Sequence, residues 1–245
     1  MLISIITVTY NASETVAKTM QSVASQSFSL YEHIIIDGAS TDETLEIVKK
    51  HSTPRTLVFS EPDKGLYDAM NKGLDRAKGE YVIFLNAGDA FASTDTLSRV
   101  ADAAKRDNTD TPDIIYGQTE LVDASGNVIG PRHLIAPDNL DFNSFKKGML
   151  VCHQAFMVKR SIAPHYNTHY RFSADYEWCL RCLKIARRNV YLGCDPVIHY
   201  LNEGMTTRNH KASLKERFKI MCKYYGTLPT IFRHIGFAFR QLKRL

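Results

Sequence analysis

The sequence predicts an α/β fold in which helices flank a mainly parallel, Rossmann-like sheet. Two observations predict it. Apolar, β-branched runs of strand length recur through the first half of the chain, and segments with the 3.6-residue spacing of helices separate them. The runs occupy residues 2–8, 33–36, 56–60, 81–85 and 114–116, and the helical segments occupy residues 13–25, 41–50, 65–77 and 95–106. Strands that alternate with helices of this length favour parallel pairing, because a crossover helix returns the chain to the same edge.

Polar residues that commonly cap helices begin the first two helical segments. We expect Asn11 or Ser13 to cap the first, and Ser40 or Thr41 to cap the second, which runs to about Lys50. A side-chain oxygen at the cap accepts a backbone N–H that the helix itself leaves without a partner.

The pattern changes after about residue 118. A hairpin is expected around Ser125–Gly126–Asn127, followed by an irregular stretch, a strand, a helix and short strands. These elements lie at residues 121–129, 131–147, 152–158, 175–187 and 190–200. We therefore expect one continuous domain with two halves (1–118 and 119–204), followed by a basic helical tail (205–245).

Composition and cysteine use are those of an ordinary globular protein. The 245 residues are 44% hydrophobic and 23% charged, and no apolar stretch approaches the ~18 residues of a spanning helix. The N-terminus is typical of a first strand rather than of a signal peptide. Five cysteines are an odd number, which favours free thiols in a reducing cytoplasm. Cys179 and Cys182 form a CxxC within a helical segment, and small apolar helix residues are preferred over a metal or redox site.

The charge is unevenly distributed along the chain. The tail, residues 205–245, carries ten Lys/Arg and one acidic residue, so its net charge is +9, whereas the rest of the chain carries −4. Four lysines recur every four residues from Lys211 to Lys223, and an amphipathic segment follows from Leu228 to Leu242. Two interpretations remain open: residues 211–245 lie on an anionic membrane surface, or their apolar face docks on the protein's own core. Nucleic acid is not expected as a partner, because the acidic body lacks a basic surface interleaved with aromatic residues.

Polar side chains follow three of the predicted strands. Thr9–Tyr10–Asn11 follows the first, Asp37 ends the second, and Asn86–Ala87–Gly88–Asp89 follows the fourth. Ligands of open α/β sheets bind beyond the carboxyl ends of the strands, so these residues are candidates for one site. No glycine-rich phosphate loop is present, and a diphosphate would need a cation, Mg²⁺ or Mn²⁺, held by a carboxylate such as Asp89. Alternatively, Asp37 and Asp89 form turns and cap helices.

These motifs resemble those of family-2 glycosyltransferases with the GT-A fold. The segments that carry the resemblance are Ile6–Asn11, Ile36–Thr44, Ser60–Gly73 and Gly79–Asp89, and Ser60–Gly73 is similar to a version found in bacterial exopolysaccharide enzymes of the colanic-acid type. The resemblance covers roughly residues 1–210. Four motifs in the right order, at the expected strand ends, make it specific.

The resemblance implies a role for each motif in binding a nucleotide-sugar donor. Thr9, Tyr10 and Asn11 would line the base pocket, and Asp37 would accept the uracil N3–H. Ala87 and Gly88 would contact the nucleotide, and Asp89 would hold the metal. Asn86 and Gly88 stand where relatives often have acids, which leaves the ribose contact open. Lys64, Asn71 and Lys72 are candidates to face the nucleotide or its phosphates, although Lys72 is equally compatible with a solvated helix lysine.

The resemblance implies that residues 1–118 bind the donor (the donor half) and that residues 119–204 bind the acceptor and supply the catalytic base (the acceptor half). Residues 173–178 resemble the family's Glu-Asp segment, with Ala174 in place of the first acid and Asp175 as the base. Arg181 would touch a phosphate or an internal acid. Without the other motifs, Asp175 would be a helix N-terminal acid that favours the helix dipole.

Four further residues and one loop are weaker candidates for the acceptor side and the metal. His153 and Gln154 would hydrogen-bond sugar hydroxyls, and Trp178 would stack on a sugar ring. A His beside an apolar strand is also typical of a core residue. His199 would be a second metal ligand, and residues 204–208 would close over the diphosphate.

The sequence thus predicts inverting, metal-dependent transfer of a sugar from a UDP-sugar to a saccharide or lipid-diphosphate-linked acceptor in bacterial polysaccharide synthesis. The expected location is the cytoplasm, peripheral on the inner face of the membrane. Two alternatives remain. A sugar nucleotidyltransferase would need a glycine-rich basic loop after the first strand, and Thr9–Tyr10–Asn11 is not one. A non-catalytic nucleotide- or saccharide-binding module is compatible with the missing acids at positions 86, 88 and 174.

Overall fold

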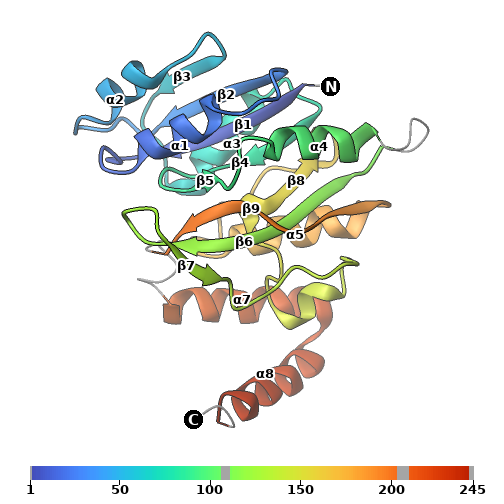
Figure 1. Cartoon of the computed structure of the whole chain (residues 1–245). Helices are drawn as coiled ribbons and strands as arrows, with labels where there is room; N and C mark the ends of the chain where they lie inside the picture. Colours follow the sequence, from blue (N-terminus) through green and yellow to red (C-terminus); the bar gives the residue numbers. More distant parts are fainter. Residues whose placement is uncertain (1, 106–110, 203–209, 243–245) are drawn as a thin grey trace.

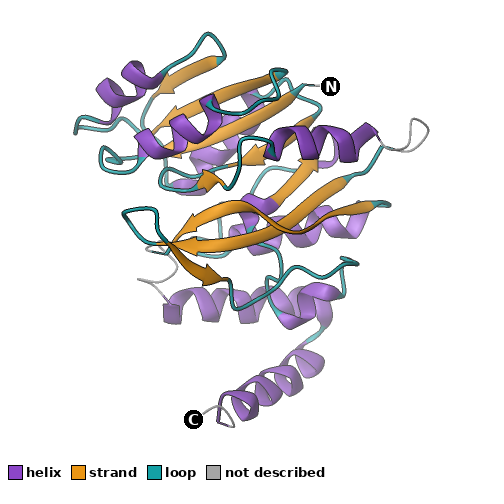
Figure 2. Ribbon diagram, in the orientation of Figure 1, coloured by secondary structure: helices purple, strands orange, loops and turns teal. Residues whose placement is uncertain are grey.

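The fold is an α/β sandwich around one sheet, seen in a computed structural model that describes residues 2–105, 111–202 and 210–242 (Figures 1 and 2). The described strands form a nine-stranded sheet in the order β3-β2-β1-β4-β8-β6-β9-β5, with β7 paired to β6. The strands are β1 (Ile3–Thr9), β2 (Tyr31–Asp37), β3 (Thr56–Ser60), β4 (Tyr81–Phe84), β5 (Ala90–Phe91), β6 (Ile114–Val122), β7 (Val128–Pro131), β8 (Phe156–Lys159) and β9 (Asn189–Leu201).

Helices cover both faces of this sheet. The described helices are α1 (Val16–Ala24), α2 (Thr44–His51), α3 (Leu66–Arg76), α4 (Thr96–Lys105), α5 (Ala174–Ile185), α7 (His210–Tyr225) and α8 (Thr227–Leu242). In Figure 1, α1 and α4 lie in front of the sheet, and α3 and α5 lie behind it. Gly73 lets α3 approach the sheet closely, because a Cβ there would stand 2.4 Å from the Ile6 side chain. The α/β prediction is therefore confirmed.

The first four strands pair in parallel, whereas the remaining strands form mixed pairs. β1 pairs parallel with both β2 and β4, and β2 pairs parallel with β3. The register places Thr9 opposite Asp37, and Asp37 opposite Ser60, so three polar strand ends meet at one edge. β8 lies antiparallel between β4 and β6, and the sheet as a whole is less parallel than the sequence predicts.

Several element boundaries differ from the expectation. α2 begins at Thr44, after Glu43, because the Ser40 hydroxyl and N–H are both used by the Asp37 carboxylate. α1 likewise begins after Thr15 without a side-chain cap. The strand expected at 152–158 starts as a 3₁₀ turn over His153–Ala155, and the short strands expected at 190–200 are one strand, β9.

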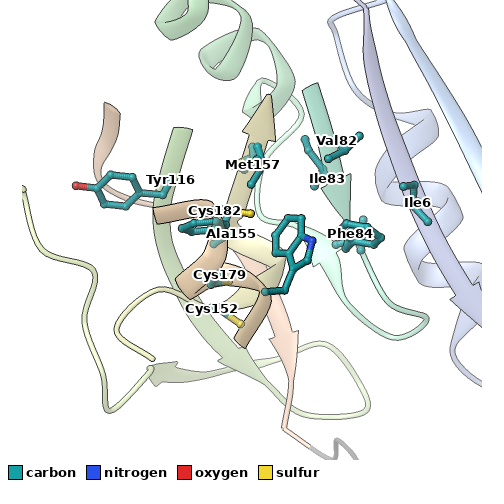
Figure 3. Close-up of a cluster of buried hydrophobic side chains, with 14 of the residues drawn as sticks. Ile6, Val82, Ile83, Phe84, Tyr116, Cys152, Ala155, Met157, Cys179 and Cys182 are labelled. Carbon is teal, nitrogen blue, oxygen red and sulfur yellow. The ribbon is translucent and has the colours of Figure 1, made fainter. Parts of the chain in front are cut away.

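The core surrounds the strands of the sheet centre and the inner face of α5. Figure 3 shows Cys179 and Cys182 of α5 in the same hydrophobic cluster as Phe84 of β4 and Met157 of β8, and all four side chains are buried. All five cysteines are free. Burial raises the pKa of the Cys179 thiol well above its ordinary value, with the nearby Cys182 acting in the same direction. These two cysteines are thus packed as small apolar residues, in agreement with the sequence-based preference.

The two helices of the tail differ in their relation to the body. α7 packs on the body: Glu216 accepts the backbone N–H groups of Arg171 and Phe172 at 2.9 and 2.8 Å, and Ile220 is buried. In Figure 1, α8 continues beyond α7, away from the sheet. Leu228 and Phe232 on α8 are each 70% exposed. Within the described residues, no helix combines the length and apolar character that a bilayer-crossing segment requires.

Candidate functional site

A cavity of about 770 Å³ opens where the donor half meets the acceptor half. Its walls come from the ends of β1 and β4, the loop after β3, α3, the 3₁₀ turn before β8, and helices α5 and α7. Eight of the sequence-predicted site residues line it: Thr9, Tyr10, Asn11, Ala87, Asp89, His153, Gln154 and Asp175. The predicted donor side and the predicted base therefore share one space.

Tyr10 stands at the mouth of this cavity. Its side chain is 66% exposed, although it follows a fully buried strand. The next residue, Asn11, adopts a positive φ of 47°, and its Oδ1 accepts the N–H of Thr41 at 2.9 Å. This hydrogen bond ties the turn after β1 to the loop after β2, so the exposed ring projects from a rigid support.

Asp37 does not reach the cavity. It is fully buried, and its two carboxylate oxygens accept four hydrogen bonds from Thr9, Ser40 and Ser60. Burial raises its pKa, but the hydrogen bonds from these residues together hold the pKa below its ordinary value. In this arrangement Asp37 fastens the ends of β1, β2 and β3 together, and its carboxylate has no exposed oxygen to offer a nucleobase.

Asp63, which the sequence analysis missed, lies against Gly38, the residue that follows Asp37. A Cβ on Gly38 would stand 2.4 Å from Asp63 Oδ2 and 3.3 Å from Tyr10 Cδ2. Asp63 lines the cavity, and its Oδ1 accepts the Gly65 N–H at 2.7 Å. The absent side chain at Gly38 thus makes room for a carboxylate beside the exposed Tyr10 ring.

The three polar candidates from residues 64–72 have other partners. Asn71 is bonded through both side-chain atoms to the Tyr166 backbone, at 3.0 and 2.6 Å. Lys72 Nζ donates to the Pro62 carbonyl at 2.7 Å and lies 3.6 Å from Glu61 Oε1. Lys64 is exposed, and its backbone N–H bonds Asp68. None of the three lines the cavity. The α3 residues that line it are Leu66, Tyr67, Ala69 and Met70.

Asp89 lies on the cavity wall with little exposure. Its Oδ2 accepts a hydrogen bond from Gln154 Nε2 at 2.7 Å, and its Oδ1 accepts the Leu201 N–H at 3.0 Å. Burial raises the pKa of Asp89 to about 7, against the effect of these hydrogen bonds and of the Lys18 charge. Gly88 supports this turn with a φ of 101°, but Gly88 itself does not line the cavity.

The residues present fit a cation held by one carboxylate. Asn86 Oδ1 is buried without a hydrogen-bond partner among the described residues, and Asn86 and Asp89 line the same cavity. No group of three or more His, Cys, Asp or Glu side chains gathers at metal-binding distance in residues 2–105, 111–202 or 210–242. Mg²⁺ is commonly bound by one or two carboxylates together with substrate phosphates and water, which matches this donor set.

Two other candidates lie away from the cavity. His199 Nε2 is 3.5 Å from Glu120 Oε2, and His199 is not among the residues that line the cavity, whereas Tyr200 and Leu201 are. Trp178 is fully buried, stacks on Tyr166 at 5.0 Å, and donates to the Pro164 carbonyl. Trp178 is therefore a core residue and cannot stack on a sugar in this arrangement. Residues 204–208, the expected closing loop, lie outside the described residues.

Asp175 lies in the first turn of α5 and lines the cavity. Its Oδ1 accepts its neighbour Tyr176's N–H at 2.8 Å and the Tyr67 hydroxyl at 3.3 Å. Burial, followed by the nearby Asp175 charge, raises the pKa of Tyr67 well above its ordinary value, so the phenol stays protonated as a donor. Arg181, one of the candidates for a phosphate, instead pairs with the internal acid Glu177 at 2.8 Å.

His153 and Gln154 line the cavity but are held in place by other side chains. His153 Nε2 is hydrogen-bonded to the Tyr166 hydroxyl, and its ring stacks on Phe84 at 5.2 Å. Burial lowers the pKa of His153 to about 4, against the opposing effect of Asp175, so the ring is neutral near pH 7. Gln154 accepts from Cys152 and donates to Asp89. Tyr67, Arg132 and Arg217 also line the cavity, and sequence spacing carried no signal for them.

Three comparisons place this chain among known proteins. The family model described as "Glycosyl transferase family 2" matches residues 4–166. A PGL/p-HBAD biosynthesis glycosyltransferase of Mycobacterium bovis (strain BCG / Pasteur 1173P2) is 34% identical over 188 residues, spanning 74% of this chain and 69% of the relative.

Solved structures of low sequence identity share the fold. S. aureus TarS (residues 1–349) superposes with a TM-score of 0.75 at 17% identity, covering 97% of this chain and 73% of TarS. Its UDP-GlcNAc complex gives 0.72 at 19% identity, covering 90% and 64%. A mannosyltransferase of Pyrobaculum calidifontis, in complex with GDP-Man and Mn²⁺, gives 0.64 at 16% identity, covering 90% and 63%. The predicted GT-A fold and the predicted family are both confirmed, and the chain belongs to glycosyl transferase family 2.

Proposed function

We propose that this protein transfers a sugar, with inversion, from a UDP-sugar to a hydroxyl group of a saccharide or lipid-diphosphate-linked acceptor. The observation that carries the proposal is the shared cavity: Tyr10 and Asp89 from the donor half line the same space as Asp175 from the acceptor half. One donor molecule can then contact an aromatic ring, a cation-binding carboxylate and a base at once.

On the donor side, the exposed Tyr10 ring offers a face on which a nucleobase stacks. In place of Asp37, we assign the carboxylate of Asp63 to accept the uracil N3–H, because Asp63 lies beside Tyr10 and lines the cavity. Thr9, Asn11 and Ala87 complete this wall. The Asp37 carboxylate keeps the supporting role that its four hydrogen bonds describe.

Asp89 and Asn86 would hold Mg²⁺ or Mn²⁺ against the donor diphosphate, and the bound cation would offset the negative charge that grows on that leaving group. Gln154 and the Leu201 N–H orient the Asp89 carboxylate toward the cavity. Because burial raises the pKa of Asp89 to about 7, a nearby cation is needed to favour the ionised form.

Asp175 would act as the general base. The acceptor hydroxyl gives its proton to an Asp175 carboxylate oxygen while the hydroxyl oxygen forms a bond to C1 of the sugar. The bond between C1 and the diphosphate oxygen breaks on the opposite face, and UDP leaves with the electron pair. Tyr67 holds Asp175 Oδ1 during this step, which leaves Oδ2 free to receive the proton.

The relatives support an assignment to bacterial cell-surface glycan synthesis. The mycobacterial relative is named for PGL/p-HBAD biosynthesis, and TarS was solved with UDP and with UDP-GlcNAc. The mannosyltransferase complex with GDP-Man and Mn²⁺ supports a divalent cation in the same fold. We extend the nucleotide-sugar donor of the two solved complexes to this chain, and we propose a glycan acceptor for it.

The test is UDP release from UDP-sugars with Mn²⁺, with Mg²⁺ and with EDTA. We expect Asp175→Asn to bind UDP like the wild type but to release it at least 100-fold more slowly, as removal of a general base requires. Asp89→Ala should lose the stimulation by Mn²⁺. Asp102→Asn, an exposed carboxylate on α4, is the matched control and should be unaffected. If Asp175→Asn turns over normally, the mechanism is overturned, and release of pyrophosphate from UTP and sugar phosphate would favour a nucleotidyltransferase.

We also propose that α8 rests on an anionic membrane surface, at the inner face of the cell membrane. Leu228, Phe232 and Ile235 are exposed on α8, and Arg233 lies among them. The competing interpretation, docking of the tail on the core, fits α7 instead, where Ile220 and Met221 are buried. Truncation after Tyr225 should release the protein from phosphatidylglycerol liposomes; unchanged co-sedimentation would remove the membrane role.

A further inference from the structure

Two arginines line the acceptor side of the cavity without a carboxylate partner. Arg132 follows β7, and Arg217 lies in the middle of α7. Among the described residues, no Asp or Glu oxygen lies within ion-pair distance of either guanidinium group. Within the described part of the chain, the Arg132 side chain donates one hydrogen bond, to the Met149 carbonyl at 3.3 Å, which leaves most of its donors available there.

Arg217 is held in the cavity wall by its own helix. Glu216, the preceding residue, bonds the backbone of Arg171 and Phe172, and Ser213 contacts the Ser173 hydroxyl at 3.1 Å. The Arg217 guanidinium carbon lies 5.8 Å from the Tyr176 ring centroid. Its Nε is buried with no hydrogen-bond partner among the described residues, so one donor is withdrawn from water and still unused. Such a group costs free energy unless a ligand accepts its hydrogen.

The charges in the cavity indicate what that ligand is. Glu14, Asp63, Asp89 and Asp175 also line the cavity, so an anion there meets four carboxylates. The proposed cation at Asp89 serves the donor diphosphate. A second phosphate group near Asp175 would be repelled unless cations lie next to it, and Arg132 and Arg217 are those cations. Guanidinium groups bind phosphate through paired N–H donors, a geometry that lysine cannot offer.

From these observations we infer that Arg132 and Arg217 form a binding subsite for a phosphate group of the acceptor. The donor-side residues Tyr10, Asp63 and Asp89 all precede β6, whereas both arginines follow it, as Asp175 does. Tyr176, on which Arg217 lies, is the neighbour of the proposed base. The subsite would therefore place a phosphate-bearing acceptor, such as a lipid diphosphate sugar, with its hydroxyl group at Asp175. This inference rests on the proposed function and deepens it.

The test measures binding of inorganic pyrophosphate and of geranyl diphosphate to the full chain, first alone and then saturated with UDP and Mn²⁺. We expect the UDP-saturated wild type to bind both, and Arg217→Gln and Arg132→Gln to bind them about 10-fold or more weakly, as loss of a charge-assisted hydrogen bond implies. UDP affinity should be unchanged in both variants. Lys215→Gln, an exposed lysine on the same helix, is the matched control. Thermal unfolding establishes that each variant is folded.

The outcomes separate the two sources of phosphate. If the arginine variants lose UDP affinity, or if UDP excludes pyrophosphate from the wild type, the pair serves the donor diphosphate and the inference is wrong. If neither variant changes binding of any phosphate ligand, the subsite does not exist, while turnover of UDP-sugars would still uphold the proposed function. If UDP does not bind at all, the proposed function fails, and the measurements without UDP still report on the arginine pair.

Discussion

The hydroxyl of Tyr67 on α3 donates a hydrogen bond to Asp175 Oδ1 on α5, across 3.3 Å and 108 residues of sequence. Tyr67 is 7% exposed and stacks on Tyr166, which in turn bonds His153. A chain of aromatic side chains thus connects the donor half to the proposed base. Helix α3 thus contributes one of the two hydrogen bonds that Asp175 Oδ1 accepts among the described residues, the other being from the Tyr176 N–H.

The Tyr67→Phe substitution tests this connection. A phenylalanine side chain at this position would keep the ring and its packing but remove the hydrogen bond, so Asp175 would be less well oriented. We expect kcat to fall about 10-fold, since a hydrogen bond to a charged group contributes about 1.5–3 kcal/mol. The dissociation constant of UDP should not change.

Tyr191→Phe is the control for this prediction. Tyr191 accepts a hydrogen bond from Gln118 and lies outside the cavity, so the same chemical change there should leave kcat as in the wild type. An unchanged kcat in Tyr67→Phe would show that Asp175 needs no support from α3. A fall in UDP affinity would instead indicate that Tyr67 acts on donor binding.

Asp37 and Asp63 should respond oppositely to replacement by Ala. Asp37→Ala would leave the hydroxyl donors of Thr9, Ser40 and Ser60 without their acceptor on a fully buried side chain, and should lower the free energy of unfolding by about 3 kcal/mol. Asp63→Ala removes a partly exposed carboxylate and should cost less than about 1 kcal/mol, but should weaken UDP binding about 10-fold.

Urea unfolding and titration calorimetry with UDP distinguish the two carboxylates. Glu61→Ala, an exposed acid two residues before Asp63, serves as the control and should match the wild type in both measurements. Suppose that Asp37→Ala is stable and binds UDP more weakly, while Asp63→Ala binds UDP like the wild type. The contact to the nucleobase would then belong to Asp37.

The free energy of unfolding should fall in acid because His33 is buried. Burial lowers the pKa of His33 to about 3, so the folded ring stays neutral while the unfolded one, with a pKa of about 6.5, takes up a proton. A lowered folded-state pKa means that the stabilisation is present above pH 6.5 and is lost progressively as the pH falls toward 3. Between pH 7 and pH 5, His33 alone should cost about 2 kcal/mol.

His33→Gln isolates this effect, because a Gln amide can still reach the Thr7 hydroxyl that His33 contacts at 2.9 Å. Urea unfolding at several pH values should show that the free energy of unfolding falls less steeply in acid in the variant. The difference in slope should correspond to about one bound proton. His51→Gln, a partly exposed histidine at the end of α2, is the control and should keep the wild-type dependence. Equal slopes in His33→Gln and wild type would contradict the assignment.

How much of the site could be predicted depended on where each residue lies in the chain. Asp89 and Asp175 were predicted because each sits at the end of an element, and the ends of elements at one sheet edge converge whatever the detail of packing. Asp37 met the same criterion, but its carboxylate is buried and hydrogen-bonded by Thr9, Ser40 and Ser60. Its position at a strand end was predicted correctly. The hydroxyl groups that surround its carboxylate come in part from two other strands, and a local sequence pattern does not predict such contacts.

The sequence by itself determined the strand–helix alternation of the donor half, the family and the order of its motifs, because continuous apolar runs and strand-end polar residues are local properties. Only the tertiary structure decided that Asp63 lies against Gly38, that Trp178 is enclosed in the core, and that α7 carries Arg217 into the cavity. These outcomes depend on which surfaces segments distant in sequence present to one another, and that choice is made by burial of the whole chain.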